Sequence, residues 1–117
     1  MEEALFRTML FDSYGELLTE KQREYFDLHY NEDLSLAEIA QNEGVSRQSV
    51  WDIIRRAEET MRRFEEKTGL VARFAAERDI LAAAREKLAR LETMTDGAAQ
   101  NLAREIAAAL QELGHGI

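Results

Sequence analysis

The stretch 33–58, DLSLAEIAQNEGVSRQSVWDIIRRAE, constrains the fold more than any other part of the chain. Ser35 and Glu38 have the spacing of a capping box, in which a hydroxyl and a carboxylate each accept a hydrogen bond from a free backbone amide. Gly44 predicts the end of that first helix, because glycine adopts the left-handed backbone conformation at little cost. Ser46 is a residue typical of the start of the next helix. The stretch therefore predicts two helices joined by a tight turn.

Both predicted helices carry an apolar face. On the first, Leu36, Ile39 and Ala40 recur at helical spacing, and Val45 in the turn is expected to point inward. On the second, the buried stripe is predicted to be Val50, Ile53, Ile54 and Ala57. The polar residues left facing outward on the second helix are Arg47, Gln48, Ser49, Asp52, Arg55 and Arg56. A short helix, a glycine turn and a second helix with a polar first turn form the helix-turn-helix pattern.

The six outward residues are the candidate nucleic-acid-binding site. In helix-turn-helix proteins the first turn of the second helix reaches the base edges, and arginine and glutamine are the donors that read guanine and adenine. The cluster Arg47-Gln48-Ser49 is therefore the strongest functional signal. The alternative is that the motif is a protein-interaction module and that these residues are ordinary surface. Trp51 could stack on a base or pack against the N-terminal helices, and packing is favoured.

The remaining chain is predicted to be helical as well, which makes the fold class all-α. Among 117 residues there is no proline, and alanine, leucine, glutamate and arginine are abundant. A helix is expected over 2–11, with a break at Gly15. Thr19, with Gln22 three residues later, predicts a second capping box for a helix that ends near Tyr30. The second helix of the motif is expected to continue to about Lys67, so that a first domain spans 1–67.

Residues 68–117 predict a C-terminal helical hairpin. Its two apolar stripes are Leu70, Phe74, Leu81, Ala84, Leu88 and Leu91, and then Leu102, Ile106, Ala109, Leu110 and Leu113. The turn between them lies near Thr93 to Gly97, where Asp96 is a candidate cap. Both stripes need cover. They could pack on the first domain or pair with another copy, so a homodimer through the C-terminal helices is one of two expectations.

The charge distribution limits what the chain can bind. The net charge is −8, and acidic residues outnumber basic ones nine to three in the first 34 residues. Phosphate contacts dominate non-specific affinity for nucleic acid, so any such contact must come from a local arginine patch. Beyond the motif, Arg62 and Arg63 follow Glu58 and Glu59 at i,i+4. They are interpreted as salt-bridged surface rather than as phosphate contacts.

No constellation of catalytic or metal-binding residues is evident, so the chain is not expected to be an enzyme or to hold a cofactor or metal. The two histidines are His29, expected to pack among aromatic residues or to lie partly exposed on its helix, and His115, in a tail expected to fray. Cysteine is absent, which suits a reducing compartment. No apolar run approaches the length needed to span a bilayer, and the acidic N-terminus does not resemble a signal peptide. A cytoplasmic protein without stable membrane insertion is expected.

The segment LLTEKQREYFDLHYNEDLSLAEIAQNEGVSRQSVWDIIRRAE closely resembles the YlxM family of bacterial helix-turn-helix proteins. It is more distantly similar to region four of sigma factors. The matching pieces are YGELLTEKQREY, the acidic turn with LSLAEIA, and GVSRQSVWD, which together cover roughly residues 10–64. Trp51 stands where the family pattern leads us to expect tyrosine, and the C-terminal hairpin carries no motif that can be assigned.

The resemblance implies an accessory, non-enzymatic role in the signal recognition particle pathway of co-translational membrane targeting. The implied partners are the particle's RNA, its GTPase subunit, or both. The nucleic-acid-binding face carried over from the resemblance is the same set: Arg47, Gln48, Ser49, Asp52, Arg55 and Arg56. Two other functions stay open. One is a sigma-like DNA-binding transcriptional regulator, and the other is a protein-interaction module that uses the acidic N-terminal helices.

Overall fold

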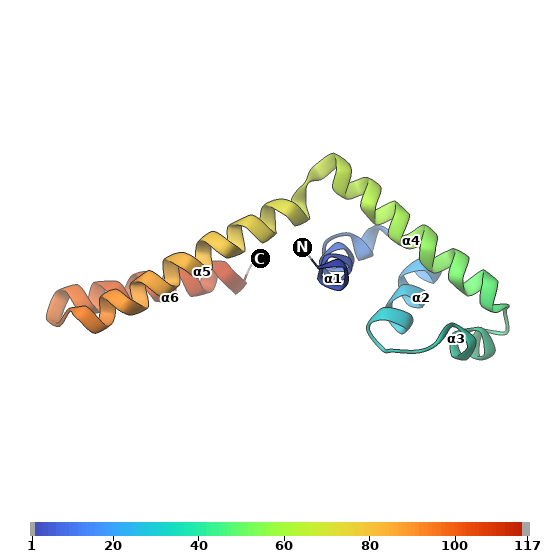
Figure 1. The fold of residues 1–117 in the computed structure, drawn as a ribbon, viewed down its shortest axis with the longest axis horizontal. Helices are drawn as coiled ribbons and strands as arrows, with labels where there is room; N and C mark the ends of the chain where they lie inside the picture. The colour runs from blue at the N-terminus through green and yellow to red at the C-terminus, as the bar shows by residue number, and fades with distance from the viewer. Residues whose placement is uncertain (1, 116–117) are drawn as a thin grey trace. The chain divides into compact units, whose positions relative to one another are not determined.

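The computed structural model describes residues 2–115, and its regular secondary structure is entirely helical over that part of the chain. The elements are α1 (Glu3–Tyr14), a 3-10 turn η1 (Gly15–Leu17), α2 (Glu20–Tyr30), α3 (Leu36–Glu43), α4 (Arg47–Thr68), α5 (Leu70–Met94) and α6 (Gly97–His115) (Figure 1). The prediction of an all-α fold is confirmed. The chain divides into two compact units between Val71 and Ala72, whereas the sequence predicts a boundary after residue 67.

The first unit is built around α4. Helices α1, α2 and α3 pack against the same side of that helix (Figure 1). The buried residues of α4 are Val50, Ile54, Ala57 and Met61, which recur at the spacing of one helix face. They meet Leu10, Tyr14, Leu18, Tyr25, Phe26, Ile39, Ala40 and Val71 in one apolar core. The outward side of α4 is therefore left for other partners.

Local capping interactions set the helix boundaries as predicted. The Ser35 Oγ accepts a hydrogen bond from the Glu38 amide at 3.0 Å, and the Glu38 carboxylate accepts one from the Ser35 amide at 3.0 Å. The bond from the Ser35 backbone lowers the pKa of Glu38. The same reciprocal pair forms between Thr19 and Gln22. Gly44, with φ 69° and ψ 34°, ends α3 in the left-handed conformation. The helix-turn-helix geometry is thus determined by short-range hydrogen bonds.

Three expectations for the first unit were wrong in detail. Val45 does not point inward but is 41% exposed, because Ile39 and Val50 already fill the core beneath the turn. Ile53 is half-buried rather than part of the fully buried stripe. Helix α1 continues beyond residue 11 to Tyr14, which is buried. Gly15 does not break the chain there but stays right-handed and begins η1.

The packing prediction for His29 is confirmed. Its side chain is half-buried, and Nδ1 lies 2.7 Å from the carbonyl oxygen of Leu34. The ring also meets the edge of Tyr30, with 4.8 Å between the ring centroids. His29 therefore joins the end of α2 to the segment that leads into α3.

Gly44 offers a test of the turn. No atom lies within 4 Å of the position that a Cβ would take, so a side chain there costs only backbone strain. We expect Gly44→Ala to lower the free energy of unfolding by about 1 kcal/mol, and Gly44→Asn to cost less because asparagine tolerates this conformation. Urea unfolding followed by the fluorescence of Trp51, the chain's one tryptophan, measures both variants. Equal losses in the two variants would show that the left-handed turn is not the cause.

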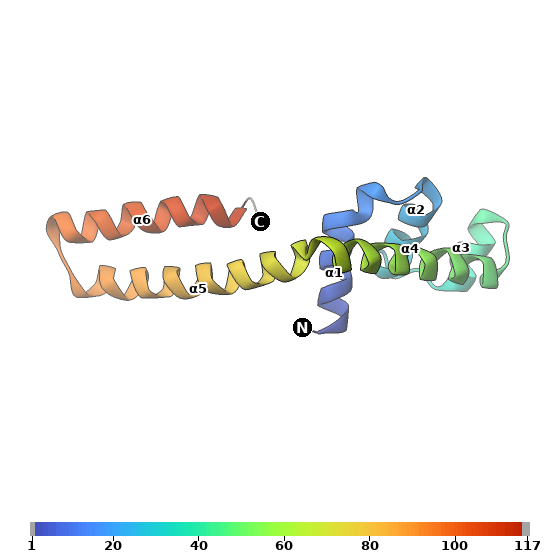
Figure 2. The ribbon, with the colours of Figure 1, turned by 90° about the horizontal axis from the view of Figure 1, so that it is seen from above.

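The second unit consists of the rest of α5 and α6, which run antiparallel and side by side (Figures 1 and 2). Helix α6 faces α5 with Gln100, Ala103, Ala107 and Leu110. The predicted apolar stripe of α6 lies mostly elsewhere, with Leu102 57%, Ile106 42% and Leu113 59% exposed. The side chain of His115 lies outside the described residues.

Candidate nucleic-acid interface

The first turn of α4 is positioned by the Gly44 turn and by Ser46, whose Oγ accepts a hydrogen bond from the Ser49 amide at 3.0 Å. Because the apolar stripe of α4 is buried against α1–α3, the other side of the helix faces outward. Of the six predicted site residues, five are exposed and Asp52 is half-buried. The outward placement predicted for the set is thus observed.

Four of the six residues are engaged with neighbours on the same helix end. The Gln48 Nε2 donates to the Asp52 Oδ1 at 3.0 Å. The Arg55 guanidinium donates to Glu59 Oε1 at 2.7 Å and lies 3.9 Å from Asp52 Oδ1. Ser49 takes part in the helix cap, since the Ser46 hydroxyl donates to the Ser49 Oγ at 3.0 Å. The charge of Arg55 is therefore balanced by two carboxylates in the unbound protein.

Arg47 and Arg56 differ from Arg55. Within the part of the chain that the structure describes, neither guanidinium forms an ion pair. Arg56 follows Arg47 by nine residues, which is about two and a half helical turns, so the two side chains leave α4 on opposite flanks. The structure therefore brings Gln48, Asp52 and Arg55 onto one outward row. The two uncompensated cations lie on either side of that row.

Trp51 lies on the same flank as Arg47. It is 38% exposed and lines an open hollow of about 520 Å³ together with Leu36 of α3, Arg47 and Gln48. It also borders a smaller hollow of about 260 Å³ that is lined by Arg7 and Tyr30. The ring is not part of the buried core, although packing was the favoured interpretation. A partly exposed indole beside a guanidinium is an arrangement on which a base can stack.

An ion-pair network behind Trp51 was not predicted in full. The Arg7 guanidinium of α1 donates to Glu58 Oε1 at 2.6 Å and stacks over the Tyr30 ring at 4.4 Å. Arg62 donates to the other oxygen of Glu58 at 3.1 Å and also pairs with Glu3. The prediction that Arg62 is a salt-bridged surface residue is confirmed. The same prediction for Arg63 is wrong, because Glu59 pairs with Arg55 and Arg63 forms no ion pair with another described residue. The link from α1 was missed, because 51 residues separate Arg7 from Glu58 and no local pattern joins them.

The network has a clear electrostatic signature. Burial by itself would raise the pKa of Glu58, but the hydrogen bonds from Arg7 and Arg62 outweigh it and leave that pKa lowered. The bond to Glu58 raises the pKa of Arg7 in turn. Glu58 is therefore ionised and holds two arginines in place. This fixes α1 against α4 on the flank that carries Trp51.

The described residues include neither a candidate metal site nor a helix that could span a membrane. No group of three or more His, Asp or Glu side chains there could hold a metal ion. No helix in the described range combines the length and the apolar character that crossing a membrane requires.

The capped turn, the buried stripe of α4 and its polar first turn define a helix-turn-helix protein. A model of the UPF0122 family, with the description "Putative helix-turn-helix protein, YlxM / p13 like", matches residues 1–101. The chain belongs to this family, which confirms the resemblance seen in the sequence. The match extends beyond residues 10–64, through α5 and into α6.

Individual relatives carry the same family name. A UPF0122 protein of Clostridium kluyveri is 54% identical over 71 residues, which is 61% of this chain and 64% of that protein. One of Desulforamulus reducens is 52% identical over 69 residues, 59% of each chain. The match thus spans about three fifths of the length of these two relatives. One of Shouchella clausii is 45% identical over 89 residues, covering 76% of this chain and 82% of that protein.

Proposed function

We propose that this protein is a non-enzymatic accessory component of the signal recognition particle pathway and that it binds the particle's RNA through α3 and α4. The observation that carries the proposal is the pairing of Arg47 with the partly exposed Trp51 at the hollow beside Leu36. Structured RNA offers unstacked bases in loops and bulges, which proteins bind by stacking on aromatic rings and guanidinium groups. The assignment to the signal recognition particle pathway rests on the resemblance to the YlxM family.

Charge favours one structured partner over general attraction to nucleic acid. The net charge is −8, and Arg55 is already balanced by Asp52 and Glu59. Only a few phosphates can then be neutralised, so the electrostatic part of the affinity is small. Affinity must come mainly from shape and stacking, which a folded RNA provides and a uniform duplex does not.

A second candidate is a sigma-like DNA-binding regulator. It is favoured by the placement of Arg47 and Arg56 on opposite flanks of α4, with Gln48 between them on the outward row. A helix in the major groove of DNA has a phosphate backbone on each side and base edges in front. This arrangement fits that geometry, although the carboxylate of Asp52 would also face the groove.

Titration of the full chain with three ligands separates these functions. The ligands are the particle's RNA, an unrelated RNA hairpin and a random duplex DNA, and the fluorescence of Trp51 reports binding directly. We expect the particle's RNA to bind most tightly and to quench Trp51. An Arg47→Ala/Arg56→Ala variant should bind about tenfold more weakly, with a shallower salt dependence. The charge-matched control Arg23→Ala/Arg63→Ala should bind like the unmodified chain.

Each contrary outcome has a definite meaning. Preferential binding of duplex DNA would replace the proposal with the DNA-binding regulator. Unchanged RNA binding in the Arg47→Ala/Arg56→Ala variant would remove the assigned face. Absence of binding to all three ligands, with capture of the purified GTPase subunit, would identify a protein-interaction module instead.

A further inference from the structure

The helical hairpin of the second unit exposes an unusual amount of apolar surface. Six of the ten large apolar side chains that are exposed in the described chain belong to it: Ile80, Leu91, Met94, Leu102, Ile106 and Leu113. Ala103 is the one buried residue among the described side chains from position 72 onward. Two helices that pack only on each other leave this apolar surface in contact with water, and burying it would be favourable. The hairpin therefore presents an apolar face that a partner can cover.

The exposed stripes of α5 and α6 lie on the same side of the hairpin. On α5 the half-buried Leu81 faces α6, and the exposed Ile80 precedes it by one residue. On α6 the buried Ala103 faces α5, and the exposed Leu102 precedes it by one residue. One residue is about 100° of helical rotation. On each helix the exposed stripe is thus turned by about 100° from the face that meets the other helix, in the same sense along its own chain direction. Because the two helices run in opposite directions (Figure 2), these two rotations bring both stripes to the same side of the hairpin.

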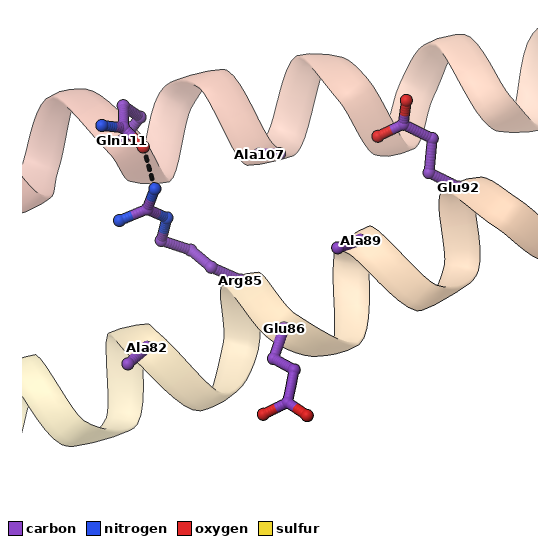
Figure 3. Close-up of a pocket in the computed structure, with 7 residues that line it drawn as sticks. All are labelled: Ala82, Arg85, Glu86, Ala89, Glu92, Ala107 and Gln111. Carbon is purple, nitrogen blue, oxygen red and sulfur yellow. Dashed lines mark hydrogen bonds between the residues drawn. The ribbon is translucent and has the colours of Figure 1, made fainter.

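The other side of the hairpin is polar. It holds an open groove of about 400 Å³ between the two helices, lined partly by the small side chains Ala82, Ala89 and Ala107 (Figure 3). Arg85 donates a hydrogen bond across this groove to Gln111 (Figure 3). Further along, the Arg104 Nε donates to Glu92 Oε1 at 2.6 Å. Bonds between the helices thus lie on the polar side, and the apolar side is left uncovered.

Charges are placed with a pattern on the apolar side. Arg73 and Glu77 also lie on this side of α5, but before the stretch that α6 accompanies. Within that stretch Lys87 lies in the α5 stripe, seven residues after Ile80, and Glu105 and Glu112 border the α6 stripe along its outer edge. None of these three charged side chains forms an ion pair with another described residue.

Contacts between the helices determine which of these charges share a level. The Gln100 Nε2 of α6 donates to the carbonyl oxygen of Glu92 in α5 at 3.1 Å. The side chains also pair across the hairpin, Arg85 with Gln111 and Glu92 with Arg104, and these pairs set its register. This register places Lys87 of α5 opposite Ala109 of α6. Along the helix axis, Lys87 therefore lies midway between Glu105 and Glu112 of α6.

We propose that the apolar side of the hairpin binds the same side of a second copy of this chain. The two-fold axis runs parallel to α5 and α6, so that α5 of each copy packs on α6 of the other. Such a rotation does not shift residues along the helix axis, so residues that lie opposite each other within one hairpin also lie opposite each other between the copies. Lys87 of one copy then lies between Glu105 and Glu112 of the other. The result is a four-helix arrangement in which every neighbouring pair is antiparallel.

The charges select this arrangement over the other face-to-face dimer. A two-fold axis perpendicular to the helices would place α6 on α6 and bring the acidic edges of the two copies together. Like charges facing each other across an interface are unfavourable. The parallel axis instead pairs each basic position with acidic ones. The same surface thus supplies both the apolar contact and the charge complementarity that a second copy satisfies.

Sedimentation velocity on the full chain tests the proposal without any nucleic acid. We expect a dimer of the 13.4 kDa chain and expect Ile106→Glu to convert it to a monomer of unchanged helical content by circular dichroism. The matched control is Ala108→Glu, which adds the same charge to the polar side of α6 and should remain dimeric. Lys87→Glu should raise the dimer dissociation constant about tenfold, and adding Glu105→Lys and Glu112→Lys should restore it to within about threefold.

Three results would overturn the proposal. One is a full chain that is still monomeric at about 100 μM, a concentration well above the dissociation constants of stable homodimers. The second is a dimer that survives Ile106→Glu. The third is failure of the charge exchange to restore association in a variant that keeps its helical content. If Ile106→Glu instead lowered the unfolding temperature of a monomeric chain, the first unit of the same chain would be the cover.

Discussion

Replacement of Ile54 by alanine is expected to lower the free energy of unfolding of the first unit by about 3 kcal/mol. Ile54 is 1% exposed and belongs to the α4 stripe that meets the core residues of α1, α2 and α3. Removing its side chain loses buried apolar contact and leaves a cavity, because the surrounding side chains belong to separate helices and cannot all move inward. Urea unfolding followed by Trp51 fluorescence measures the loss.

Ile53 provides the matched control, since it is the same residue type on the same helix, one position away. It is half-buried, and its removal leaves an indentation at the surface rather than an enclosed cavity. We expect Ile53→Ala to cost less than half as much as Ile54→Ala. Equal losses would mean that the buried stripe of α4 is not centred on Val50, Ile54, Ala57 and Met61.

The helix boundaries of the motif could be predicted because their causes are local. Ser35 and Glu38 are three residues apart and complete their capping box whatever the rest of the chain does. Gly44 ends α3 by its own backbone preference. Val45 was mispredicted for the opposite reason. Whether an apolar residue after the turn points inward depends on how much room Ile39 and Val50 leave, which is a property of the assembled core.

The outward placement of the six candidate residues was predictable, but the way they are organised was not. Helical periodicity places the six residues outward on α4, which the structure bears out. The nine-residue spacing of Arg47 and Arg56 places them on opposite flanks of a helix, so they do not form the single local arginine patch that the charge distribution suggests. The neutralisation of Arg55 by Glu59 could be predicted from their i,i+4 spacing. The contact of Arg7 with Glu58 could not, since it depends on how α1 crosses α4.

Replacement of Glu58 by alanine is expected to cost about 2 kcal/mol, because it removes the shared partner of two arginines and leaves Arg7 partly buried beside Tyr30. Glu59→Ala is the matched control. Glu59 is exposed on the same helix and pairs only with Arg55 among the described residues, so its loss should cost less than about 0.5 kcal/mol. Similar losses in the two variants would show that Glu58 contributes no more than a surface ion pair.

The same carboxylate predicts a pH dependence with a definite sign. Because folding lowers the pKa of Glu58, its contribution to stability is complete above the ordinary glutamate pKa and is lost as the pH falls through the lowered value. Glu58→Gln keeps the side-chain size but cannot ionise. The difference in unfolding temperature between the unmodified chain and Glu58→Gln should therefore be largest at neutral pH and should shrink below about pH 4. Thermal unfolding between neutral and acidic pH measures it, and a difference that stayed constant would mean that ionised Glu58 does not hold α1 against α4.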